Sequence, residues 1–319
     1  MMKTENVIVG LAGGVGGARL ARGLARIVGT QLAMVVNTGD DFDHFALRIC
    51  PDLDTVMYTL AGKANPETGW GVAGESWNFM AEMAGLGGAD WFRLGDRDLA
   101  THVLRTALLR EGQTLTAVTA TLAARLGIEA SILPMTDALV RTRVETATGV
   151  LDFQDYFVRQ RCEVPIRGLR FDGAGEAQAS GEVMHALEAA RVVVICPSNP
   201  FVSIDPILAV GDVRRRLQEH PAPVVAVSPI IGGKAVKGPA AKMMAELGHP
   251  VSSLTVAARY RDLLDGIVID HEDAHLAPTI DALGLSVRVT RTLMPTPAES
   301  LSLAEEVLQF AEAICPWRR

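Results

Sequence analysis

Hydrophobic residues along this chain form short uninterrupted runs and longer segments in which they recur every three or four positions. The run at residues 7–11 leads into glycines, and residues 18–27 carry Leu20, Leu24 and Ile27 at helical spacing. A second apolar run occupies residues 32–36 and ends in polar residues. A strand, a glycine turn, a helix and a second strand in this order predict a βαβ unit, which begins a parallel sheet.

Strands of the same kind return in the second half of the chain. The pattern predicts short strands around residues 141–146, a helix over 181–190, buried strands at 192–196, 224–227, 266–270 and 287–290, and a closing helix over 298–313. Residues 55–126 are instead rich in Ala, Leu and Met, with Trp70, Trp77 and Trp91 on turns between expected helices. We therefore predict an α/β fold. Residues 1–54 and 127–319 form a Rossmann-like, mostly parallel sheet with helices on both faces, and residues 55–126 form a mainly helical insertion.

Composition narrows the classes of partner. Hydrophobic residues make up 49% of the 319 residues, enough to bury a large core. The net charge of −7 argues against nucleic acid as a partner, because such binders usually present a basic stripe. Small anionic ligands stay possible, and the four cysteines have no CxxC spacing that would indicate zinc. No apolar run approaches the roughly 20 residues of a membrane span, so we expect a cytoplasmic protein without a membrane partner.

The first strand ends in a glycine-rich turn. Gly13, Gly14, Gly16 and Gly17 precede the first predicted helix, and Arg19 follows them. Glycines let the backbone approach a phosphate, and a helix start offers N–H groups and the positive end of its dipole. The spacing matches neither the GxGxxG dinucleotide motif nor the P-loop. Phosphate or nucleotide binding is the favoured interpretation, and tight packing of the strand against the helix is the alternative.

Aspartates gather after the second strand. They are Asp40, Asp41, Asp43, Asp52 and Asp54, on two loops that we expect to converge. Carboxylate oxygens suit magnesium, which commonly bridges one or two carboxylates to substrate phosphates. The alternative is turn and cap chemistry, because Asp is favoured in both places. Asp54 precedes a predicted helix over residues 55–60, so helix capping would also explain it.

Two further groups of polar residues are candidates for ligand binding. In the segment that holds Arg93, Asp96 and Asp98, an arginine could bind a phosphate or carboxylate, although a solvated or mutually paired charge cluster is slightly favoured. The nearby His102 is expected to be structural. Prolines fix the loops at residues 197–200 and 228–233. They leave Ser198, Asn199 and Ser228 to contact a nucleotide, with Lys234 and Lys237 close behind. Purely structural turns are the alternative for these loops.

Taken together and in order, these motifs resemble the 2-phospho-L-lactate transferase family of deazaflavin coenzyme biosynthesis. The residues that carry the resemblance are Gly13–Arg19, Asn37–Asp41, Pro51–Thr55, Leu94–His102, Pro197–Pro200 and Ser228–Ile231. Members of this family transfer a 2-phospho-L-lactyl, phosphoenolpyruvyl or phosphoglyceryl group from a guanosine diphosphate-linked donor to the deazaflavin Fo, 7,8-didemethyl-8-hydroxy-5-deazariboflavin. They release GMP and require magnesium.

The resemblance implies a homodimer with a Rossmann-like core. It implies guanine nucleotide binding along the glycine turn and the Ser198–Asn199 loop, and Asp40 and Asp54 as catalytic residues that hold the metal. Asp54 and Arg93 would border the deazaflavin, with the helical insertion around this acceptor site. Trp91 is a candidate to stack on the deazaflavin ring, and a role in the core explains it equally well.

Two other functions stay open at the level of the residues. The βαβ start is also typical of NAD(P)-dependent oxidoreductases. A nucleotide-binding metabolite sensor is the second alternative, because a fold of this kind can bind a ligand without catalysing a reaction.

Overall fold

The computed structural model describes residues 6–314, and its centre is a seven-stranded sheet. The strands, all parallel, run in the order β14 (Ser286–Thr290), β13 (Gly266–Asp270), β10 (Val224–Val227), β9 (Ala190–Ile195), β1 (Val7–Ala12), β2 (Leu32–Val36) and β5 (Ser131–Pro134). The chain leaves β1 in one direction along the sheet and continues from β9 in the other. The gap between the carboxyl ends of β1 and β9 is therefore the point where ligands bind in sheets of this type.

The apolar runs form strands because both faces of the sheet are covered. In β1, Ile8 and Ala12 face one hydrophobic cluster, and Val9 and Leu11 face the other. The first cluster contains α1 (Gly14–Val28), α2 (Pro51–Leu60), α5 (Leu115–Arg125) and α12 (Pro297–Ile314). The predicted α/β fold with helices on both faces is confirmed.

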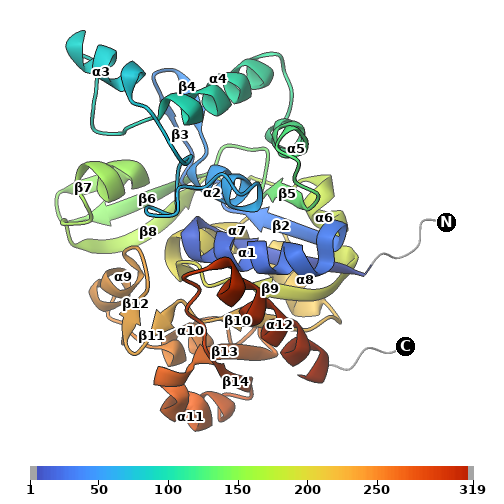
Figure 1. The fold of residues 1–319 in the computed structure, drawn as a ribbon. Helices are drawn as coiled ribbons and strands as arrows, with labels where there is room; N and C mark the ends of the chain where they lie inside the picture. Colours follow the sequence, from blue (N-terminus) through green and yellow to red (C-terminus); the bar gives the residue numbers. More distant parts are fainter. Residues whose placement is uncertain (1–5, 315–319) are drawn as a thin grey trace.

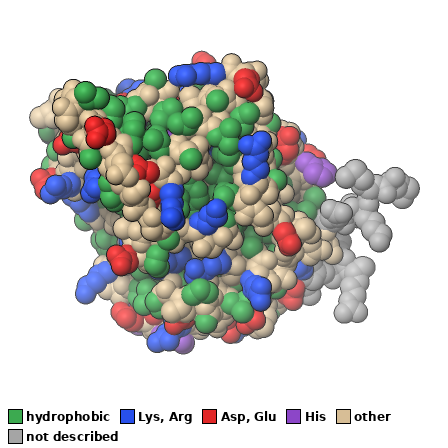
Figure 2. All heavy atoms as spheres, turned by 45° about the horizontal axis from the view of Figure 1, so that its top comes forward, with side chains coloured by type: hydrophobic (Ala, Val, Ile, Leu, Met, Phe, Trp, Pro, Cys, Tyr) green, Lys and Arg blue, Asp and Glu red, His purple; other side chains and the backbone are tan. Residues whose placement is uncertain are grey.

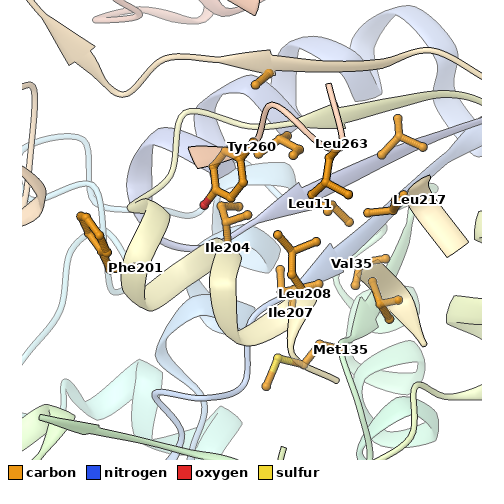
Figure 3. Packing of buried hydrophobic residues seen from close by; sticks show 14 of the residues in the cluster. Leu11, Val35, Met135, Phe201, Ile204, Ile207, Leu208, Leu217, Tyr260 and Leu263 are labelled. Carbon is orange, nitrogen blue, oxygen red and sulfur yellow. The ribbon is translucent and has the colours of Figure 1, made fainter. Parts of the chain in front are cut away.

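The opposite face of the sheet is covered by shorter helices. They are α6 (Gly181–Glu188), η3 (Pro200–Ile204), α7 (Asp205–Leu208), α8 (Val213–Glu219), α9 (Ala240–Glu246), α10 (Ser253–Arg259) and α11 (Ala277–Asp281). Figure 3 shows Leu11 and Val35 of the sheet packed beside Ile204, Ile207 and Leu208. Residues 200–208 are thus anchored in the core directly after the Pro197–Asn199 loop.

Of the predicted insertion, residues 55–126, only the middle part leaves the core. Helices α3 (Asn78–Gly85) and α4 (Asp96–Arg110) and the hairpin of β3 (Phe42–His44) and β4 (Leu47–Ile49) extend at the top of Figure 1. Helices α2 and α5 pack on the sheet instead. The boundary predicted between residues 54 and 55 therefore falls inside α2, and the hairpin was not predicted because its strands are only three residues long.

Smaller strands flank the carboxyl edge of the main sheet, at the left of Figure 1. One antiparallel sheet consists of β6 (Arg141–Thr146), β7 (Gly149–Asp152) and β8 (Ile166–Asp172), and one hairpin of β11 (Ile230–Ile231) and β12 (Lys234–Ala235). The remaining elements are η1 (Gly29–Gln31), η2 (Asp155–Arg159) and η4 (His271–Leu276). Within residues 6–314, no helix has both the length and the apolar character needed to cross a membrane.

Candidate functional site

The glycine turn lies against two other loops at the carboxyl edge of the sheet. The amide of Gly13 donates to Ser198 Oγ at 3.1 Å, and the amide of Gly14 donates to Asp52 Oδ1 at 2.7 Å. A Cβ atom on Gly16 would lie 2.2 Å from the carbonyl oxygen of Pro197, so only glycine permits this approach. Residues 13–17, 52 and 197–198 form one loop cluster at the point where the chain reverses its direction along the sheet.

Asn37 fastens the second strand to this cluster. Its Nδ2 donates to Asp52 Oδ2 at 2.9 Å and to the carbonyl oxygen of Val202 at 3.1 Å, and its Oδ1 accepts the amide of Gly39 at 2.8 Å. The side chain of Asn37 is buried, and both its nitrogen and its oxygen are hydrogen-bonded to neighbouring loops. Asn37 therefore fixes the start of the aspartate loop, which carries Asp40 and Asp41.

Asp40, Asp41 and Asp52 are buried, and of the three only Asp41 lies near arginines, which are Arg105, Arg141 and Arg48. Burial, followed by the charge of Asp52, raises the pKa of Asp40 well above its usual value. Burial also raises the pKa of Asp41 to about 7 and that of Asp52 to about 6. One carboxylate oxygen of Asp40, Oδ1, is buried without a hydrogen-bond partner among the described residues. Such an oxygen next to a second acid is a suitable ligand for a cation.

Asp54 has a different environment, because it is paired with a fully buried arginine. Arg105 of α4 donates Nη1 to Asp54 Oδ2 at 3.1 Å, and its Nη2 bonds to Oδ1 of the same carboxylate. Nη1 also lies 3.3 Å from His102 Nδ1, and guanidinium can only donate. His102 Nδ1 must then be the acceptor, which places the ring proton on Nε2, 3.3 Å from Asp98 Oδ2.

Asp98 completes this network. The hydroxyl of Tyr58 donates to Asp98 Oδ1 at 2.6 Å. Burial alone would raise the pKa of Asp98, but the contact with His102, the bond from Tyr58 and the charge of Arg105 outweigh it and lower the pKa. The network links α2 to α4, so it holds the projecting part of the insertion against the site.

Two sets of acids could hold a metal ion. Asp54, Asp98 and His102 each have one possible ligand atom within 4.8 Å of the others. In that set, however, Arg105 already neutralises Asp54. Asp40 lies instead beside Asp52, where no arginine or lysine is paired with either carboxylate in the described chain. A cation bound at Asp40 and Asp52 would therefore neutralise charge that no basic side chain neutralises, whereas Asp54 already has Arg105.

The sequence matches the family described as "CofD: 2-phospho-L-lactate transferase CofD" over residues 8–283. The chain belongs to this family. It is 42% identical over 315 residues to a phosphoenolpyruvate transferase of Kitasatospora aureofaciens, covering 96% of this chain and 98% of that protein. It is 40% identical over 299 residues to a 2-phospho-L-lactate transferase of Methanosarcina mazei, covering 93% and 98%. The resemblance that the motifs indicated is confirmed over most of the chain.

A solved structure of Bacillus halodurans, protein BH3568, has the same arrangement of elements. The superposition gives a TM-score of 0.64 and covers 95% of this chain and 99% of that chain, with 14% sequence identity. A second structure of the same protein, described as a member of the UPF0052 family, gives a TM-score of 0.63 at 15% identity. At this identity the likeness concerns the fold alone.

Several residues that were predicted to contact the nucleotide form hydrogen bonds within the protein. The amides of Gly13 and Gly14 are bonded to Ser198 and Asp52, so these two glycines provide space rather than free donors. Asn199 Oδ1 accepts the amide of Phe201. Ser228 is buried and bonded to Ser253 and Ile230. The nucleotide contacts of Ser198, Asn199 and Ser228 stay predictions.

Helix capping does not explain Asp54. Helix α2 begins at Pro51 with Cys50 at the cap position, so Asp54 lies within the first turn and its carboxylate is turned to Arg105. The prediction of a helix that starts after Asp54 was wrong because proline is favourable at the first position of a helix and sets the start earlier. The carboxylate of Asp54 is therefore held by Arg105 and does not cap the helix.

The second charged segment makes structural contacts, but within the described residues its charges are not paired with one another. Asp96 accepts the amides of Asn78 and Phe79 and so caps α3, while Glu75 accepts the amides of Arg97 and Asp98 and caps α4. These bonds, first that of Ser76, lower the pKa of Asp96 to about 2. Arg93 is exposed beside them. Its guanidinium lies over the ring of Trp77, 4.1 Å from the centroid.

Trp91 belongs to an aromatic cluster with the β3–β4 hairpin. Its ring lies 6.0 Å from Phe42 and 5.3 Å from His44, measured between centroids. The guanidinium of Arg159 lies over Trp91 at 4.4 Å. A deazaflavin that stacked on this face of Trp91 would have to displace Arg159.

Sequence reasoning overlooked Arg105 and gave no individual role to Asn37 or Asp98. It expected His102 to be structural, and His102 lies in the buried network of Arg105 and Asp54. Asn37 had a recognisable signal, because it follows a buried strand directly. Arg105 had none, since the other arginines of its helix, Arg97 and Arg110, are exposed.

Proposed function

We propose that this chain transfers a 2-phospho-L-lactyl, phosphoenolpyruvyl or phosphoglyceryl group from a guanosine diphosphate-linked donor to the ribityl hydroxyl of Fo, with release of GMP. The observation that carries the proposal is the meeting of the glycine turn, the aspartate loop and the Ser198 loop between β1 and β9, in a member of the CofD family. Relatives named phosphoenolpyruvate transferase and 2-phospho-L-lactate transferase are both about equally similar.

The nucleotide end of the donor fits the start of α1. Asp52 and Ser198 take the amides of Gly14 and Gly13, which leaves those of Val15 and Gly16 without a side-chain acceptor in the described residues. These amides and the helix dipole favour a phosphate. Figure 2 shows a hollow with hydrophobic side chains near the centre of one face, and Lys and Arg side chains along its lower border. We propose that Gly16, Gly17 and Arg19 lie along the diphosphate.

Magnesium fits the acidic part of the cluster. Asp40 has a buried oxygen without a partner and an acidic neighbour, so a divalent cation would remove a charge that burial makes costly. We propose that Asp40 holds it beside Asp52, and that Asp54, which the family resemblance implies as the second ligand, shares its carboxylate between the ion and Arg105. When bound, magnesium would stabilise the negative charge that develops on the phosphoryl oxygens.

The chain's own residues would position the acceptor. Asp54, held by Arg105, orients the ribityl hydroxyl for attack on the donor phosphorus, and the bond from phosphorus to the GMP oxygen breaks as the new bond forms. Arg93 is exposed on the insertion and would contact the deazaflavin, with Trp91 close by. The backbone amides at the glycine turn hold the leaving nucleotide.

The test is an assay of purified protein with Fo, magnesium and each of the three donors in turn. Separation of the products should give GMP and a more acidic deazaflavin with one donor or more. Asp40→Asn should abolish magnesium-dependent turnover. Asp43→Asn is the matched control, because Asp43 is exposed on the same loop and pairs with Arg48. No product with any donor would contradict the proposal.

We also propose the homodimer that the family resemblance implies. Light scattering on the purified protein should give twice the mass of one chain. The mass of a single chain, in protein that turns over Fo, would contradict the dimer without affecting the proposed reaction.

A further inference from the structure

Lys237 is a cation near the glycine turn whose charge has no acidic partner. It follows β12, and its Nζ donates to the carbonyl oxygen of Thr68. No carboxylate oxygen lies within 4.0 Å of its Nζ in the described part of the chain, and the same holds for the guanidinium of Arg19 on α1. Partial burial and the charge of Arg19 both lower the pKa of Lys237. Two basic side chains therefore repel each other beside the start of α1.

The segment Asn65–Gly71, here called the strap, brings Lys237 to this place. A Cβ atom built on Gly69 would lie 2.7 Å from Val15 Cγ1 and 3.1 Å from Lys237 Nζ, so the strap touches the glycine turn on one side and the lysine on the other. Thr68, the residue before Gly69, supplies the carbonyl to which Lys237 donates. The strap thus lies where the start of α1 and the end of the β11–β12 hairpin meet.

The strap is a closed turn with a defined conformation. The amide of Asn65 donates to the carbonyl of Gly71 at 3.0 Å, and the amide of Gly69 donates to the carbonyl of Asn65 at 2.8 Å. Ala64 and Val72 form an antiparallel bridge at its base. Gly69 has a φ of +78°, which other residues rarely adopt, and it is buried against Val15. A fixed strap holds the lysine in a fixed place.

We infer that Lys237 binds the diphosphate of the nucleotide donor, and that the strap positions it over the glycine turn. The inference rests on the proposed function and adds to it a residue from a different part of the fold. An ammonium group without a carboxylate partner, next to Arg19 and the Val15 and Gly16 amides, matches an anion that carries several charges. The anion would replace the repulsion between Lys237 and Arg19 with attraction to both.

The first measurement is calorimetric titration of GDP, which contains the diphosphate without the reactive group. Lys237→Met should weaken GDP binding by about tenfold or more, the effect of losing one charge-assisted hydrogen bond. Lys234→Met is the control, because Lys234 is an exposed lysine of the same hairpin. Lys237→Arg should restore most of the affinity. Fo binding should be equal in all of these variants.

The second measurement separates the strap from the lysine. Gly69→Ala and Gly71→Ala introduce the same side chain at positions with φ of +78° and +71°, but only the alanine at 69 meets Val15 and Lys237. Gly69→Ala should therefore weaken GDP binding several-fold more than Gly71→Ala. Equal affinities for the two variants would overturn the role of the strap.

The results also distinguish the inference from the function on which it rests. If the wild-type protein binds GDP and Lys237→Met binds it equally well, the inference fails and the proposed transfer stands. Loss of turnover in Lys237→Met with unchanged GDP affinity would also overturn the inference, because a side chain that binds the diphosphate must contribute to GDP affinity. If the wild-type protein binds no guanine nucleotide and forms no product, the proposed function fails and this inference with it.

Discussion

Arg105 donates hydrogen bonds to both carboxylate oxygens of Asp54, and both residues are buried. The pair joins α4 to the first turn of α2 and so connects the projecting helices to the loop cluster. A buried ion pair of this kind is weak evidence of net stabilisation, but removal of one partner leaves an uncompensated charge. Asp54 is therefore held in one orientation at the border of the proposed acceptor site.

Arg105→Met should destabilise the protein by about 3–5 kcal/mol, since it leaves the Asp54 carboxylate buried and unpaired. Urea unfolding measures the effect. Arg110→Met, on the exposed side of the same helix, should stay within about 0.5 kcal/mol of the wild-type protein. The double variant Arg105→Met, Asp54→Asn should recover part of the loss. Equal stability of the Arg105 and Arg110 variants would show that the pair contributes no such constraint.

The stability of the metal-free protein should fall as the pH rises from 5 to 8. Burial raises the pKa of Asp41 to about 7 and that of Asp52 to about 6, above their values in an unfolded chain. Both groups are neutral in the folded protein at pH 5, and their ionisation at higher pH favours the unfolded chain. Thermal unfolding in EDTA checks this, and Asp41→Asn should flatten the profile. Magnesium should raise the unfolding temperature at pH 8 more than at pH 5.

Gly16→Ala should disrupt the contact between the glycine turn and the Ser198 loop. The new methyl group would lie 2.2 Å from the carbonyl of Pro197, and overpacking of this kind typically costs about 1–3 kcal/mol. GDP affinity should fall together with the unfolding temperature. The control is Gly85→Ala in α3, where the added methyl group meets no atom within 4 Å. Unchanged GDP binding in Gly16→Ala would contradict a nucleotide site at this turn.

Arg93→Ala should raise the KM for Fo by about tenfold, the effect of losing one charged contact, and leave the affinity for GDP unchanged. Arg93 is exposed and stacks only on Trp77, so the fold should be unaffected. Steady-state kinetics with each substrate varied separately measures the difference. Arg93→Lys should retain most of the activity. An equal rise in the KM for the donor would contradict a contact between Arg93 and the deazaflavin alone.

Much of the core was predictable because its signals are local. The strands at 32–36, 224–227 and 266–270 were predicted with the bounds that the structure has, since each is an apolar run that ends in a turn. The hairpin at residues 42–49 and strand β8 were not, because strands at a partly exposed sheet carry polar residues that resemble loops. The sequence also predicted the start of α2 at residue 55 and not at Pro51, and this error made helix capping by Asp54 look possible.

Within the site, the chain by itself determined which loops would gather. Glycine, aspartate and serine follow the ends of parallel strands, and such ends must share one edge of the sheet. The family, too, could be recognised from these short motifs.

Tertiary structure alone decided which side chains are partners. Ser198 meets Gly13 across 185 positions of sequence, and Arg105 meets Asp54 across 51. No local pattern distinguishes an arginine that will be buried from one that will be solvated, because the cost of burying its charge is offset only by a carboxylate that folding brings to it.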